Sequence, residues 1–149
     1  MRIRRAILAD VPAILTLEKR AATAAHWSVQ QYETAILGEA PARVVLIVED
    51  QGTGLQGFIV GKFLQQEWEI ENMIVAEHVQ RRGLGSRLLR EFLDLARGQG
   101  AQAVFLEVRE SNAAARRLYE KCAFVESGRR KVYYREPDED AIVYRATLP

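Results

Sequence analysis

The chain contains little of what disulfide-linked, metal-binding and membrane proteins depend on. Its 149 residues include one cysteine, Cys122, which excludes an internal disulfide and is typical of a reducing compartment. A cysteine cluster for zinc is excluded as well, and the two histidines, His26 and His78, lack the spacing of metal ligands. No apolar run reaches the length of a membrane span. The sequence therefore predicts neither a metal site nor a membrane segment.

An excess of charge of either sign is also missing. With 21 basic and 20 acidic residues the net charge is +1, which gives no indication of binding to nucleic acid or to an anionic membrane. The basic N-terminus (Arg2, Arg4, Arg5) precedes an apolar stretch that stops at Asp10 and Pro12, which is too short for a signal peptide. We therefore expect a cytoplasmic protein.

Length and apolar periodicity predict one α/β domain with a mixed sheet, covering residues 1–149. No repeat, linker or low-complexity segment interrupts the chain. Helices are expected to begin near residues 10, 28, 84 and 112, each at a capping residue or a glycine-containing turn. Strands are expected at residues 1–8, 44–48, 57–64, 67–75, 103–108, 132–134 and 141–144.

The segment Gln80–Gly85, with the sequence QRRGLG, carries the strongest functional signal. It follows the strand-like run Met73–Val75 and opens an amphipathic helix, so that backbone N–H groups at the helix start would face a bound anion. Arg81 and Arg82 add positive charge at this point. The segment lacks the defining residues of a P-loop and of a dinucleotide-binding loop. An ordinary helix start with a solvated basic turn is the alternative interpretation.

Further motifs follow the loop in succession, at Gly83–Leu89, Leu106–Arg109, Ser111–Ala115, Leu118–Glu120 and Phe124. Together they resemble the GNAT family of N-acetyltransferases, and within it the RimI-like branch that acetylates the N-terminal alanine of ribosomal proteins. The resemblance implies the GNAT acyl-CoA N-acyltransferase fold and transfer of an acetyl group from acetyl-CoA to a primary amine. It also implies that the acceptor is the N-terminus of a protein, for example of a ribosomal protein. No metal is expected, because the thioester is already activated.

Acetyl transfer to an amine needs a base that takes the proton of the amine and an acid that protonates the departing thiolate. The resemblance assigns the base to Glu107 in Leu-Glu-Val-Arg and the acid to Tyr119 in Leu-Tyr-Glu. Independently of the family, Glu107 lies at the end of an apolar strand, where open sheets bind their ligands. The alternatives are an ion pair of Glu107 with Arg109 and a half-buried core position for Tyr119.

The resemblance also implies how acetyl-CoA is held. The strand before the loop pairs with the pantetheine arm through main-chain groups, and a bulge there would direct a backbone N–H at the thioester oxygen. The helix start takes the pyrophosphate, and an asparagine at the next helix hydrogen-bonds the cofactor or, alternatively, only caps that helix. These cofactor-binding residues are Met73, Ile74 and Val75 in the strand, Arg81, Arg82, Gly83, Leu84, Gly85 and Ser86 at the helix start, and Asn112.

Aromatic residues are expected on the acceptor side. Trp27, Tyr133 and Tyr134 resemble residues that flank the peptide entrance in such enzymes, and packing in the core is the alternative. An alternating acidic stripe either attracts a cationic acceptor or is simply an exposed strand face; it consists of Glu67, Glu69 and Glu71.

One position departs from the family pattern. Ala123 stands where the family has a glycine before the phenylalanine, here Phe124. If the turn at this position requires φ > 0, alanine strains it.

Two other functions compete with the leading one. A GNAT enzyme of the same fold could instead use a lysine side chain, a polyamine or another small amine as acceptor. A CoA-binding regulatory protein without catalysis is the third reading, against which the presence of both Glu107 and Tyr119 argues. We expect a monomer or a weak homodimer.

Overall fold

The fold is built on one mixed β-sheet with the strand order β1-β2-β3-β4-β5-β7-β6. The computed structural model describes residues 1–21, 26–38, 42–77, 79 and 83–149. β4 and β5 run parallel, whereas the other neighbouring strands pair antiparallel. The strands are β1 (Arg2–Arg5), β2 (Arg43–Asp50), β3 (Gly54–Leu64), β4 (Glu67–Val75), β5 (Ala103–Arg109), β6 (Val125–Tyr134) and β7 (Glu139–Thr147).

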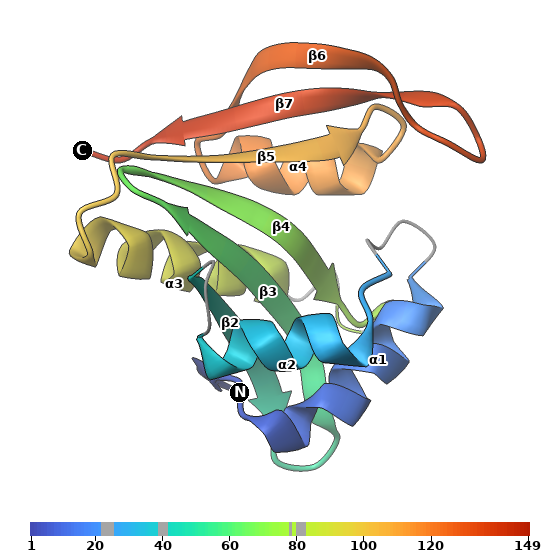
Figure 1. Cartoon of the computed structure of the whole chain (residues 1–149), viewed down its shortest axis with the longest axis vertical. Coiled ribbons are helices and arrows are strands. Elements are labelled where there is room, and N and C mark those ends of the chain that lie inside the picture. Colours follow the sequence, from blue (N-terminus) through green and yellow to red (C-terminus); the bar gives the residue numbers. More distant parts are fainter. Residues whose placement is uncertain (22–25, 39–41, 78, 80–82) are drawn as a thin grey trace.

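Helices cover both faces of the sheet (Figure 1). α3 (Leu84–Gly98) and α4 (Ala113–Lys121) pack into one apolar cluster, and α1 (Val11–Arg20) and α2 (Val29–Leu37) pack into a second. A short 3-10 helix, η1 (Leu8–Asp10), precedes α1. The predicted mixed α/β architecture is therefore confirmed. Within the described ranges, no helix combines the length and the apolarity needed to cross a bilayer.

β2 contributes side chains to both apolar clusters. Val44 and Leu46 pack toward α3, whereas Val45 and Ile47 pack toward α1 and α2. Because successive side chains of a strand point to opposite faces, a strand that is covered on both sides must be apolar throughout. Each such side chain stabilises the fold by about 1.5–3 kcal/mol when it is fully buried. The continuous apolar run that predicted a buried strand is thereby explained.

The boundaries of α2 follow the signals in the sequence. The hydroxyl of Ser28 accepts a hydrogen bond from the Gln31 N–H at 3.1 Å, and the Gln31 side chain accepts one from the Ser28 N–H at 2.8 Å. This reciprocal capping box satisfies two N–H groups at the start of the helix. The helix ends at Gly38, which takes the left-handed conformation with φ 74°. Both predicted ends of α2 are confirmed.

Two predictions at the N-terminus were wrong in detail. The first strand ends at Arg5 and does not continue to Leu8. Asp10 does not cap α1 with its side chain. Its carboxylate instead accepts hydrogen bonds from the Arg4 guanidinium at 2.9 Å and from the Ile7 N–H at 2.8 Å. A nearby cation competes successfully for a carboxylate that would otherwise cap the helix.

The C-terminal hairpin is longer than the sequence predicted. β6 begins at Val125, whereas the predicted strand covered only residues 132–134. Its residues are exposed almost throughout, so no apolar alternation marks the additional length. β6 lies at the edge of the sheet, where charged side chains such as Arg129 and Arg130 protect against further strand pairing.

β4 separates from β5 halfway along its length. Pairing with β5 ends at Ile70, and the two strands diverge toward their C-terminal ends (Figure 1). Opposite β3, Ile70 and Asn72 pair with adjacent residues, which leaves Glu71 as the extra residue of a β-bulge. The bulge expected at residues 73–75 therefore lies at Glu71. A bulge bends its strand, which separates β4 from β5 at this point.

Candidate active site

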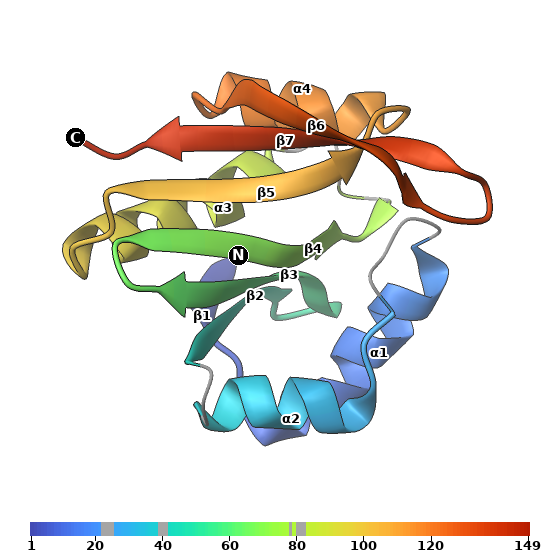
Figure 2. The same ribbon diagram turned by 45° about the horizontal axis from the view of Figure 1, so that its top comes forward.

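A cavity of about 690 Å³ opens where β4 and β5 diverge. Its walls come from β4, β5, α4, the segment before α2 and the distal end of β6. Figure 2 shows the β6–β7 hairpin reaching past the ends of these strands, at the end of the sheet where α1 ends. The predicted site residues that line the cavity are Trp27, Met73, Glu107, Asn112, Tyr119, Tyr133 and Tyr134.

The other predicted cofactor residues that the structure describes lie outside this lining. Ile74 is buried in the apolar cluster of α1 and α2, and Val75 is the last residue of β4. The residues from Gly83 to Ser86 form the start of α3. Arg81 and Arg82 lie outside the described residues.

Glu107 projects from β5 with a largely buried side chain, 13% exposed. Its carboxylate lies 2.9 Å from Nε of Arg130 on β6, and its negative charge raises the pKa of the nearby Tyr133 hydroxyl. The alternative partner Arg109 pairs with Glu139 at 3.2 Å instead. The ion pair of Glu107 therefore runs to the neighbouring hairpin and fixes the carboxylate in the cavity wall.

Tyr119 is buried on α4 but borders the same cavity. Its ring packs edge to face on Phe124 with ring centroids 5.7 Å apart. Among the described residues, its hydroxyl has no hydrogen-bond partner. Burial, with a smaller contribution from Tyr134, raises the pKa of the Tyr119 hydroxyl well above its usual value. The phenol is therefore held as a neutral proton donor at physiological pH.

Tyr133 and Tyr134 stand at the mouth of the cavity with their rings edge to face, 5.1 Å apart. The Arg130 guanidinium lies over the Tyr133 ring at 5.2 Å, and the Arg109 guanidinium lies over the Tyr134 ring at 4.5 Å. Tyr133 is 49% exposed, which is not a core position. Burial and the charge of Glu107 raise the pKa of Tyr134 to about 12.

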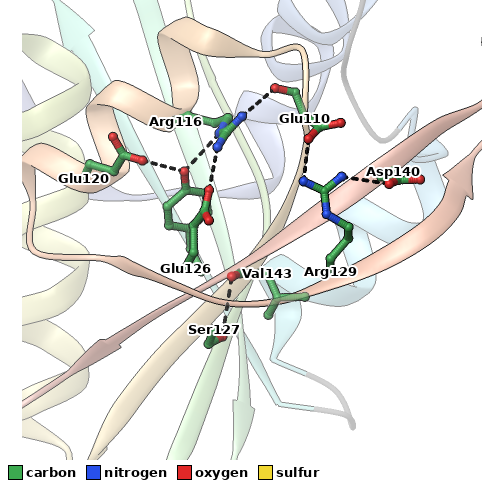
Figure 3. A network of polar contacts seen from close by, with 9 residues as sticks. Glu110, Arg116, Glu120, Glu126, Ser127, Arg129, Asp140 and Val143 are labelled. Atoms are coloured by element: carbon green, nitrogen blue, oxygen red, sulfur yellow. Dashed lines mark hydrogen bonds and ion pairs between the residues drawn. The ribbon is translucent and has the colours of Figure 1, made fainter.

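A charged network fastens the β6–β7 hairpin to α4 (Figure 3). Arg116 of α4 donates to the Tyr144 hydroxyl at 3.0 Å and to the Glu126 carboxylate at 2.5 Å. Arg129 of β6 bridges Glu110 at 2.5 Å and Asp140 at 2.8 Å. Each exposed pair contributes little alone, but a network restricts the hairpin that carries Tyr133 and Tyr134.

The start of α3 has the geometry of an anion site. Gly83 precedes the helix with φ 77°, and no side chain caps the helix. Arg87 is the first residue whose N–H bonds back into the helix, to the Gly83 carbonyl at 3.0 Å. The N–H groups of Leu84, Gly85 and Ser86 therefore have no acceptor within α3 and, with the helix dipole, favour an anion.

Gly85 also has a packing role that the sequence did not reveal. A Cβ at this position would lie 3.1 Å from Cδ2 of Leu118. The missing side chain allows α3 to approach α4 closely, so a larger residue would displace Leu118 from the position beside Tyr119. Glycine here sets the close spacing of α3 and α4.

Asn112 caps α4, as the alternative interpretation stated. Its side-chain oxygen accepts a hydrogen bond from the Ala115 N–H at 3.2 Å. The cap uses the oxygen, and the side-chain NH₂ has no protein partner among the described residues. Because Asn112 also lines the cavity, capping leaves its donor group available to a ligand.

A buried polar cluster behind the cavity was not predicted. The Glu18 carboxylate on α1 accepts hydrogen bonds from the Tyr32 hydroxyl and, at 3.1 Å, from the Trp27 N–H. Asn72, next to the bulge of β4, donates to the same Tyr32 hydroxyl at 3.0 Å. A signal was present in the sequence: Glu18 falls four residues after Ile14, on the buried face of α1. A carboxylate in that position requires buried donors.

The three glutamates of the acidic stripe lie in different environments. Glu67 is exposed and forms an ion pair with Arg145, and Glu71 pairs with Arg43 at 2.6 Å. Glu69 lines the cavity, where burial and then the neighbouring carboxylates raise its pKa above the usual value. The exposed-face interpretation therefore fits Glu67 but not Glu69.

Ala123 takes φ 72°, so the condition under which alanine strains the turn after α4 is met. The Ala123 N–H bonds to the Glu120 carbonyl at 3.2 Å, and the Phe124 N–H bonds to the Tyr119 carbonyl at 3.0 Å. These are the two bonds of a Schellman motif, which normally contains glycine. Alanine keeps the motif at the expense of backbone strain.

The sequence profile of the acetyltransferase (GNAT) family matches residues 11–124. The chain belongs to this family. It is 35% identical over 136 residues to the ribosomal protein bS18-alanine N-acetyltransferase of Salmonella typhimurium, covering 90% of this chain and 88% of that protein. It is 46% identical over 79 residues to the N-alpha-acetyltransferase RimI of Mycobacterium tuberculosis, covering 53% of this chain and 48% of the relative.

The crystal structure of the Escherichia coli ribosomal-protein-S18-alanine N-acetyltransferase has the same fold. It superposes with a TM-score of 0.84 at 29% identity and covers 99% of this chain and 93% of that one. The predicted GNAT fold and RimI-like resemblance are confirmed. The protein is an acetyl-CoA-dependent N-acetyltransferase, because that is the activity of the family and of the relatives it matches over most of their length.

Proposed function

We propose that this acetyltransferase acetylates the α-amine of an N-terminal alanine, on a ribosomal protein of the bS18 type. The observation that carries the proposal is that Glu107 and Tyr119, from different elements, border one cavity with Trp27 and Tyr134 at its walls. The Salmonella relative is an alanine N-acetyltransferase of ribosomal protein bS18. This chain spans nearly the whole of that relative, including the regions that contribute both sides of the cavity.

Glu107 acts as the general base and Tyr119 as the general acid. A peptide α-amine has a pKa of about 7.7–8.0, so it must lose a proton to become a nucleophile. Glu107 takes that proton, with its carboxylate oriented by Arg130 at 2.9 Å. As the new C–N bond forms and the C–S bond breaks, Tyr119 gives its phenolic proton to the leaving thiolate. Its raised pKa keeps that proton in place until then.

The chain offers donors suited to the cofactor, which supplies the acetyl group already activated as a thioester. The N–H groups of Leu84, Gly85 and Ser86 suit the pyrophosphate, because the helix start has no other acceptor within α3. Residues Met73–Val75 lie beyond the point where β4 stops pairing with β5, which leaves room for the pantetheine arm between the strands. Asn112 contributes its side-chain NH₂.

The acceptor peptide enters between the segment before α2 and the β6–β7 hairpin. Trp27 belongs to the first wall, and Tyr133 and Tyr134 belong to the second. Each wall is held by its own polar network, the first by Glu18 and the second by Arg116 and Arg129. A slot between two fixed walls suits an extended chain end.

A three-acceptor assay tests this proposal. We expect faster release of CoA with a peptide that begins with alanine than with the same peptide carrying a blocked α-amine and one lysine, and faster release than with spermidine. Preferential transfer to lysine or to spermidine would contradict the peptide α-amine as acceptor and leave the acetyltransferase in place. No transfer to any of the three would contradict the proposed function altogether.

We further propose a single catalytic domain over residues 1–149, a cytoplasmic location, no direct contact with nucleic acid and a monomer or weak homodimer in solution. Sedimentation of the purified enzyme at several concentrations measures the last of these.

A further inference from the structure

Glu69 and Glu107 lie on the same face of adjacent strands in the active-site cavity. In the parallel register, Glu69 of β4 is opposite Phe105 of β5, and Glu107 is the next residue of β5 on that face. Both carboxylates line the cavity. Burial, then the charge of Glu71 and then that of Glu107, raises the pKa of Glu69. Glu69 and Glu107 therefore share, together with Glu71, the space in which the acceptor amine must react.

Three of the four neighbouring acidic residues have a cationic partner. Glu107 pairs with Arg130, Glu71 with Arg43 and Glu67 with Arg145. Among the described residues, Glu69 forms no such pair.

Among the described residues, the cations that influence Glu69 act without forming an ion pair with it. Lys62 is the cross-strand neighbour of Glu69 on β3, yet no ion pair joins them. Lys62 and Arg130 lower the pKa of Glu69 less than burial and the neighbouring carboxylates raise it. The cavity therefore retains one negative charge that no cation of the described residues neutralises directly.

We propose that Glu69 is a specificity-determining residue that binds the positive charge of the acceptor beside the general base. The inference rests on the proposed function, because it concerns the acceptor of that reaction. An acceptor α-amine reaches the cavity mainly as an ammonium at neutral pH. Glu107 is already compensated by Arg130, so Glu69 is the carboxylate left to attract the cation and to hold it where Glu107 can take a proton.

The positive charge that Glu69 binds has two possible sources in the acceptor. One source is the α-ammonium, which every substrate of this enzyme carries. The other is a lysine or arginine side chain at the second position of the peptide, which only some substrates carry. Two peptides that begin with alanine distinguish them, one with glutamine and one with lysine at the second position.

The test measures peptide KM, acetyl-CoA KM and kcat for the wild-type enzyme and for Glu69→Gln with both peptides. We expect the peptide KM to rise about tenfold, as for the loss of one charge-assisted contact, while the KM of acetyl-CoA stays unchanged. If the peptide KM rises with both peptides, Glu69 binds the α-ammonium. If the peptide KM rises with the lysine peptide alone, Glu69 binds the lysine side chain at the second position. Added salt should reduce the difference between the two enzymes, since it screens the attraction.

Glu67→Gln is the matched control, because Glu67 lies on the same strand and the same face but is exposed and paired with Arg145. It should leave both KM values unchanged. Equal peptide KM for wild type and Glu69→Gln with both peptides would overturn the inference. A wild-type enzyme that acetylates neither peptide would instead overturn the proposed function, so the two failures are distinguishable.

Discussion

Asn72 on β4 donates its side-chain amide to the Tyr32 hydroxyl on α2 at 3.0 Å, and both side chains are buried. Through Tyr32 the contact extends to Glu18, which also holds the backbone of Trp27. The bulged strand on one side of the cavity and the segment on the other side are thus joined by one polar chain. Such a chain fixes their separation, because every buried member needs its partner.

Tyr32→Phe should lower the free energy of unfolding by about 1–3 kcal/mol, because it removes a donor from the buried Glu18 and an acceptor from Asn72. The KM of the acceptor peptide should rise more than that of acetyl-CoA, since the loosened segment carries Trp27. Urea unfolding and steady-state kinetics measure the two effects. Ser127→Ala, which removes a hydroxyl from the exposed β6, should change stability by less than about 0.5 kcal/mol. An unchanged unfolding free energy for Tyr32→Phe would contradict this account.

Glu107→Gln and Tyr119→Phe should each lower kcat by roughly 10²–10⁴, the usual contribution of general acid–base catalysis. Acetyl-CoA affinity should change little, because both substitutions keep the shape of the side chain. Calorimetric titration with the cofactor and turnover at saturating substrates separate binding from chemistry. Glu91→Gln on the exposed face of α3 serves as the control. Wild-type turnover in Tyr119→Phe would reduce that residue to a packing role.

Gly83→Val should weaken acetyl-CoA binding by at least about tenfold. A β-branched residue does not tolerate φ 77°, so the first turn of α3 would shift and at least one N–H donor would leave the pyrophosphate. Gly98→Val is the matched control at the other end of the helix, where an added Cβ has no neighbour within 4 Å. Calorimetric titration of both folded variants with acetyl-CoA measures this. Equal affinities of the two variants for acetyl-CoA would contradict binding of the pyrophosphate at this helix start.

Glu69→Gln should raise the melting temperature at pH 7–8. The raised pKa of Glu69 means that the folded state holds its proton more tightly than the unfolded state, whose pKa is near 4.5. Stability therefore falls as pH rises above that value, and the cost is complete above the folded pKa. The glutamine removes this cost, so its advantage should vanish near pH 4. A pH series of thermal scans checks this, with Glu67→Gln expected to show no such gain.

Ala123→Gly should raise the free energy of unfolding by about 0.5–1 kcal/mol, because glycine relieves the strain at φ 72°. The greater conformational entropy of glycine in the unfolded chain offsets part of this stabilisation. Ala114→Gly, on the exposed face of α4, should lower it by about 0.5–1 kcal/mol. Chemical unfolding of both variants provides the comparison. A loss of stability in both would show that the turn is not strained.

The local chemistry of the chain determined much of the fold. The capping box at Ser28, the left-handed Gly38 and the unbroken apolar run of β2 each specify their element within a few residues. The order of the motifs also identified the family, and with it the residues assigned to catalysis. Only the last three residues of β6 were predicted, because an exposed edge strand needs no apolar alternation.

Only the tertiary structure decided which charges meet. The alternative interpretation paired Glu107 with Arg109, two residues away, but Glu107 pairs with Arg130 and Arg109 pairs with Glu139 of the hairpin. Likewise, three glutamates that look equivalent in the sequence lie in three different environments. Glu67 forms an exposed ion pair, Glu71 forms an ion pair at the bulge, and Glu69 is a cavity carboxylate without a cationic partner in the described part of the chain. Strand register and the bulge set these partners, and both depend on pairing between residues far apart in the chain, which local sequence patterns do not encode.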